Sequence, residues 1–140
     1  MPRLAAENNN LPPSDEKPGQ GLATVAELLY LFNLLLLPGI AFIILLLVYM
    51  RYRNTSPPLA VCHLRQTVSA SIWAGVMLVL VNALIILLGG YDSPSTWIVV
   101  ILYFTTIHAT LILLGSLGLA KAMANKHYHF PLIGRSCSGE

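Results

Sequence analysis

Charged residues are scarce in this chain. Lysine, arginine, aspartate and glutamate together make up 10% of its 140 residues, whereas soluble domains contain about 25%. The net charge of +2 is too small for a nucleic-acid-binding surface, so we expect no nucleic-acid partner. With 56% hydrophobic residues, the composition predicts an integral membrane protein whose first partner is the lipid bilayer.

Catalytic signatures are also missing. The sequence contains no readable serine–histidine–aspartate arrangement, phosphate-binding glycine loop, H-E-x-x-H pair or paired-carboxylate site. We therefore expect a protein that is not an enzyme and that needs no cofactor.

Cysteine is rare, and the two cysteines lack the C-x-x-C spacing of a metal or redox motif. Cys62 and Cys137 both fall in segments with a cytoplasmic charge pattern, where thiols stay reduced, so we expect no structural disulfide. A zinc site built from Cys62, His63, His127 and His129 is an alternative, because thiolates and imidazoles are zinc ligands. Simple packing or hydrogen bonding of these side chains is the favoured interpretation, and no metal is expected.

Apolar residues are concentrated in three blocks, residues 22–50, 67–90 and 96–120. A hydrocarbon core of about 30 Å needs roughly 20 helical residues, and the second and third blocks meet this length without a single charged residue. The pattern predicts an all-α bundle of three transmembrane helices over residues 22–120. A polar tail at residues 1–21, expected to be disordered, precedes it, and a cytoplasmic tail at residues 121–140 follows it.

The first block is longer than one span requires and contains Pro38-Gly39 near its middle. Proline removes a helical hydrogen bond and glycine loosens the backbone, so we expect a long helix that is kinked or broken there. A re-entrant hairpin of residues 27–37 and 39–50 is the less favoured alternative, since neither half alone crosses a bilayer.

The connections between the blocks differ in charge. By the positive-inside rule the basic segments 51–66 and 121–140 are cytoplasmic and the acidic connection 91–95 is external. With three spans, this places the N-terminus outside and the C-terminus in the cytoplasm of a multi-pass cell-membrane protein.

Two polar residues fall inside the predicted spans, Asn82 in the second and His108 in the third. The simplest interpretation is a hydrogen bond that holds the two helices together. A proton relay or a metal or haem ligand at His108 is the functional alternative, because ionisable groups inside a membrane are costly. Glu27 is interpreted as an interfacial carboxylate.

Two short motifs carry a resemblance to a known family. His63-Leu64-Arg65-Gln66 opens the second span, and residues 120–132 end the third span in an aromatic-Pro-Leu segment. Together they resemble a domain-of-unknown-function family of small bacterial membrane proteins related to the Tic-twenty component of the chloroplast inner-envelope translocon. The resemblance implies a helical inner-membrane protein but no activity. Where that family commonly has glycine before the aromatic-Pro element, this chain has Lys126.

Because antiparallel helices bring these motifs together, we expect them to form a cytoplasmic docking rim for a partner or a lipid headgroup. Its members are His63, Arg65, Gln66, His127, Tyr128, His129 and Pro131. The leading functional hypothesis is a non-catalytic accessory or assembly subunit of a larger membrane complex. The alternatives are a homo-oligomeric transporter or translocation-channel component, and a metal- or haem-associated redox subunit that uses His108.

Overall fold

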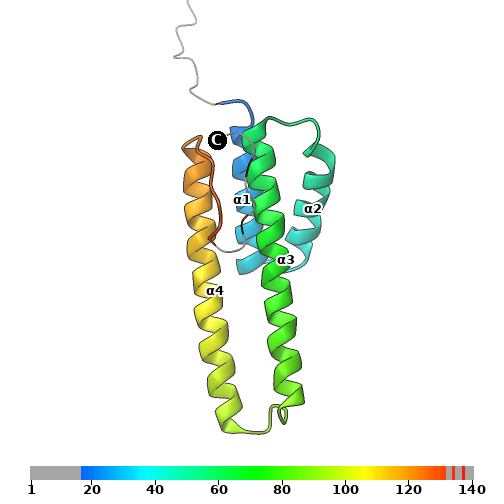
Figure 1. The fold of residues 1–140 in the computed structure, drawn as a ribbon, viewed down its shortest axis with the longest axis vertical. Coiled ribbons are helices and arrows are strands. Elements are labelled where there is room, and N and C mark those ends of the chain that lie inside the picture. The colour runs from blue at the N-terminus through cyan, green and yellow to red at the C-terminus, as the bar shows by residue number, and fades with distance from the viewer. Residues whose placement is uncertain (1–16, 132–133, 135–136, 138–140) are drawn as a thin grey trace, which may run out of the picture.

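Four helices make up the described part of the chain. The structure, a computed structural model, describes residues 17–131, 134 and 137. The helices are α1 (Gln20–Leu35), α2 (Ile40–Tyr52), α3 (Pro58–Leu87) and α4 (Pro94–Met123), as Figure 1 shows. The all-helical class is the one that the sequence predicts. Residues 1–16 of the polar N-terminal tail lie outside the described residues.

The first apolar block forms two short helices and not one long one. α1 ends at Leu35 and α2 begins at Ile40, and α2 runs back antiparallel to α1 (Figure 1). Between them Gly39 has φ +88°, a backbone conformation that side chains with a Cβ rarely adopt, and its N–H donates to Asn33 Oδ1 at 3.0 Å. Of the two expected forms, kinked or broken at Pro38-Gly39, the block takes the broken one, and its halves form a helical hairpin instead of one long helix.

The hairpin brings the start of α1 to the end of α4. The Lys17 N–H donates to Asn125 Oδ1 at 3.3 Å, and Gln20 Nε2 donates to the Met123 carbonyl at 2.7 Å. We call this end of the molecule, with the α2–α3 connection, the near end, and the end with the α3–α4 connection the far end (Figure 1). Lys17 and Asn125 therefore lie at the same end of the molecule.

α3 and α4 are the two helices long and apolar enough to cross a membrane among the described residues. α1 packs between them at the near end and contacts each more extensively than they contact one another. In the far-end half α3 and α4 continue without α1 or α2 beside them (Figure 1). Only 17% and 6% of the residues in their most apolar stretches are buried, so neither is the enclosed core helix of a soluble domain.

The end of α4 turns the chain back along the bundle. Asn125 is left-handed (φ +57°), the Lys126 N–H donates to the Lys121 carbonyl, and the Asn125 N–H donates to the Ala122 carbonyl. This is a Schellman motif, in which asparagine takes the place that glycine usually holds. The reversal explains how the chain tolerates Lys126 before its aromatic segment.

The returning segment packs on α1. Phe130 makes edge contacts with Tyr30 and Tyr128, with ring centroids 5.5 and 5.1 Å apart. Tyr30 and Phe130 are both buried, and Ala70 of α3 completes this cluster. Tyr128 and Phe130 therefore belong to the core of the near-end half.

Candidate functional site

A buried acid–histidine pair lies at the centre of the near-end half. Glu27 of α1 and His63 of α3 are both 0% exposed, and Glu27 Oε1 lies 2.6 Å from His63 Nδ1. The other ring nitrogen, His63 Nε2, lies 3.0 Å from the Lys126 carbonyl oxygen. The pair therefore joins α1, α3 and the segment after α4 in one polar contact.

Two glycines of α4 make room for the side chains of α1. A Cβ on Gly118 would lie 2.6 Å from Glu27 Oε2, and a Cβ on Gly115 would lie 2.6 Å from the Tyr30 ring. Only glycine allows α1 to approach α4 this closely. Glu27 Oε2 faces Gly118 and has no hydrogen-bond partner among the described residues.

This arrangement can share a proton but offers no access for a substrate. A carboxylate and an imidazole 2.6 Å apart can exist as an ion pair or as a neutral acid and base. With both side chains fully buried, no reactant can reach either group. Structurally, the pair ties together three segments that are far apart in the sequence.

The predicted docking rim is an internal contact more than a surface. His63, Gln66 and Tyr128 are buried, whereas Arg65 and Pro131 are exposed. Sequence reasoning did bring the two motifs together correctly, since Gln66 Nε2 lies 3.3 Å from His129 Nδ1. The expectation of an exposed rim does not hold for His63, Gln66 and Tyr128, because the chain that reverses after α4 covers the start of α3.

Tyr128 illustrates the low polarity of the contact between the start of α3 and the segment after α4. Its hydroxyl oxygen is buried without a partner among the described residues. Burial, reinforced by the negative charge of Glu27, raises the pKa of Tyr128 above its usual range. The phenol therefore stays neutral at physiological pH.

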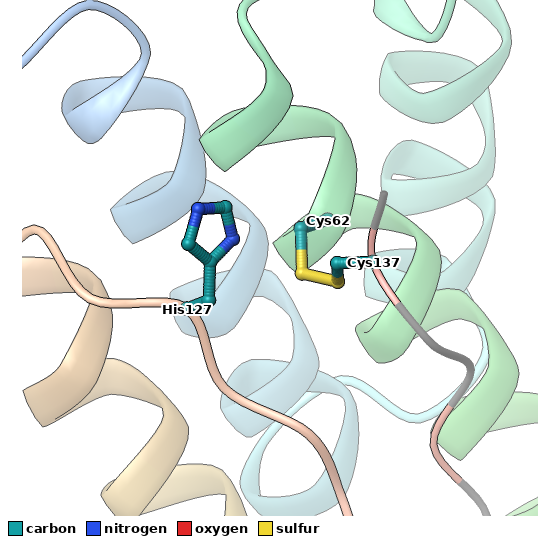
Figure 2. A group of neighbouring side chains, drawn as sticks. All are labelled: Cys62, His127 and Cys137. Atoms are coloured by element: carbon teal, nitrogen blue, oxygen red, sulfur yellow. A yellow bond between two sulfur atoms is a disulfide. The ribbon is translucent and has the colours of Figure 1, made fainter. Parts of the chain in front are cut away.

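The two cysteines are joined. Cys62 and Cys137 form a disulfide with their Cα atoms 5.4 Å apart, which corrects the expectation of two separate thiols. His127 lies beside the bond, as Figure 2 shows. The alternative zinc site of Cys62, His63, His127 and His129 has a different membership in the structure. His63 contacts Glu27 and the Lys126 carbonyl instead, and Cys137 lies with Cys62 and His127.

Asn82 and His108 each contact other residues, and the predicted hydrogen bond between them is not seen. Asn82 Nδ2 donates to the Leu78 carbonyl at 2.8 Å, and the Tyr91 hydroxyl donates to Asn82 Oδ1. His108 stacks on Phe104 with ring centroids 5.1 Å apart. The expected bond between the two helices is thus replaced by contacts within α3 and its following loop, and within α4.

An open apolar groove of about 940 Å³ lies between α3 and α4, beside the turn of the α1–α2 hairpin. Its walls are mostly aliphatic and aromatic, and its few polar side chains are Asn33, Ser71, Tyr103 and His108. Ser71 Oγ is buried and has no partner among the described residues. The groove exists because the hairpin accompanies only half the length of α3 and α4.

Sequence reasoning missed three residues of the buried cluster. Glu27 was assigned to the membrane surface, and Gly115 and Gly118 were not singled out. The available signal was a pair of glycines, Gly115 and Gly118, about one turn apart on one face of an otherwise bulky apolar helix, since small residues on a helix face allow close helix contact.

Comparison of the chain with protein-family models, with characterised proteins and with solved structures gave no match.

Proposed function

We propose that this chain is a non-catalytic integral membrane protein, an accessory or assembly subunit that binds a transmembrane helix of a larger complex between α3 and α4. The observation that carries the proposal is the open groove of about 940 Å³ beside the hairpin. There the bundle is only two helices wide, and an apolar surface stays uncovered.

The membrane setting rests on length, burial and charge. Counting about 20 residues back along α3 from Leu87 reaches Thr67, so the hydrocarbon core would contain about two thirds of α3, from the far end to beside the hairpin turn. The Glu27–His63 pair then lies at the interface. The near end also carries Arg51, Arg53 and Lys126, and the positive-inside rule makes it the cytoplasmic end.

A helix suits the groove better than a compact ligand does. Ala74, Gly75 and Ala83 line it on the α3 side, and small residues allow the backbone of another helix to approach closely. The unpartnered Ser71 hydroxyl offers a hydrogen bond to that helix. Aromatic side chains on the α4 side, Tyr103 and Phe104, supply contact area.

A second candidate function is a homo-oligomeric translocation component. The observation that favours it is the placement of Asn33, Ser71 and His108 along one groove, since polar side chains inside a membrane often line transport paths. One chain has too few helices to enclose a pore, so this function requires several copies.

The test compares two glycine variants. Gly75 lies in the groove and Gly21 lies outside it, and a Cβ at either position would have no atom within 4 Å. Gly75→Leu should therefore fill the groove without disturbing the chain's own packing, and Gly21→Leu is the matched control. Each variant is extracted from its native membrane in mild detergent, and the co-purifying proteins are identified by mass spectrometry.

We expect a stoichiometric membrane partner with the wild type and Gly21→Leu, and its loss with Gly75→Leu. A wild-type chain that extracts as a monomer, or a partner that Gly75→Leu retains, would contradict the proposal. An assembly that contains only copies of this chain would favour the translocation component.

A further inference from the structure

Three potential metal ligands from distant parts of the chain meet at the near end. Cys62 lies in α3, His127 follows α4, and Cys137 lies outside any helix near the C-terminus. Their ligand atoms all lie within 4.8 Å of one another (Figure 2). Two sulfurs and an imidazole form a ligand set typical of zinc.

The His127 side chain is available for such a role. Its Nδ1 atom is buried and has no hydrogen-bond partner among the described residues. A buried ring nitrogen without a partner is unfavourable, and a metal ion would supply the missing contact. Figure 2 shows the imidazole ring directly beside the disulfide.

We propose that reduction of the Cys62–Cys137 disulfide converts this cluster into a metal site, in which Cys62, His127 and Cys137 bind one Zn²⁺ ion. The disulfide takes two electrons and two protons from a dithiol reductant, which becomes a disulfide itself. Zinc then displaces the two thiol protons to solvent. The S–S bond and the metal are thus alternative ways of holding the C-terminal segment on α3.

The dimensions and the charge fit this ion. Zinc bonds of about 2.3 Å to sulfur and about 2.0 Å to nitrogen place tetrahedral ligand atoms about 3.5 to 3.8 Å apart. The observed spread of up to 4.8 Å needs only a small contraction around His127, together with separation of the two sulfurs. Two thiolates, one neutral imidazole and Zn²⁺ sum to zero charge, which lowers the cost of burial beside Cys62. The fourth position is left for water or a further ligand.

The test uses Co²⁺ as a spectroscopic substitute for zinc on the purified full-length chain in detergent. The reduced wild type should bind one equivalent with thiolate-to-cobalt charge-transfer absorption, and Zn²⁺ should abolish that absorption by displacement. The oxidised wild type should give none. This comparison needs no substitution, so it does not depend on the folding of a variant.

Variants then assign the ligands. Cys62→Ser and His127→Gln should each weaken Co²⁺ binding at least about tenfold, whereas His108→Gln, a histidine in the distant groove, should bind like the wild type. Failure of the reduced wild type to bind Co²⁺, equal binding by the oxidised chain, or full affinity in His127→Gln would overturn the proposal.

Discussion

At the scale of single residues, the Glu27–His63 contact has the largest energetic consequence. Both side chains are fully buried, and the Glu27 carboxyl group has His63 as its polar contact among the described residues. Leaving one charged or polar group of a buried pair without its partner commonly costs about 3–5 kcal/mol, whereas replacing both by apolar groups is much less costly.

We therefore expect strong coupling between these two positions. Glu27→Met and His63→Leu should each lower the free energy of unfolding by about 3–5 kcal/mol, and the double variant should lose clearly less than the sum. A double-mutant cycle of unfolding in detergent measures the difference. Arg65→Met, an exposed position two residues from His63, should change stability by less than about 0.5 kcal/mol. Additive losses would show that the contact contributes no coupling.

Sequence alone could not pair these residues. Glu27 and His63 lie 36 positions apart, and the hairpin turn at Pro38-Gly39 sets α1 beside the start of α3. The Cys62–Cys137 bond was missed for a related reason. Spacing says nothing about a segment that reverses at Asn125 and returns along the bundle.

At the scale of elements, the long helices were predictable and the hairpin was not. The length and absence of charge in two apolar blocks indicated α3 and α4, although α3 begins earlier, at Pro58, because proline is favoured in the first helical turn. Pro38-Gly39 is compatible with both a kink and a turn. The choice depends on tertiary packing, above all on the space that Gly115 and Gly118 leave for α1.

Replacing glycine by alanine should have opposite effects on stability at Gly75 of α3 and Gly115 of α4. A Cβ on Gly115 would meet the Tyr30 ring at 2.6 Å, so Gly115→Ala should destabilise the chain by about 1–3 kcal/mol. Gly75 has open space around it, and Gly75→Ala should stabilise the chain by up to about 1 kcal/mol through helix propensity. Thermal unfolding of the two variants beside the wild type is the measurement. A neutral Gly115→Ala would mean that α1 and α4 are less closely packed.

At the scale of the whole molecule, the hairpin changes the number of helices that could cross a membrane. With α1 and α2 turning back beside the same half of the bundle, two helices among the described residues, α3 and α4, are long and apolar enough to span. If α3 and α4 are the spans, Lys17 and Asn125 lie on the same side of the membrane, an orientation that differs from the one expected from three spans.

Thiol labelling in intact cells distinguishes the two topologies. In a Cys62→Ser, Cys137→Ser background, single cysteines replace Lys17, Thr55 or Asp92, all exposed positions. We expect Lys17→Cys and Thr55→Cys to react with an impermeant reagent from one side, and Asp92→Cys from the other. Reaction of Lys17→Cys from the same side as Asp92→Cys would instead support the topology with three spans.

The half-length hairpin also gives the molecule a wedge-shaped outline. Four helices lie side by side at the near end, and only α3 and α4 continue to the far end (Figure 1). In a bilayer spanned by α3 and α4, such a body would occupy more lateral area in one leaflet than in the other. Unless a partner fills the narrow half, the surrounding lipids would have to make up the difference, and the chain would then favour membranes that curve toward its far end.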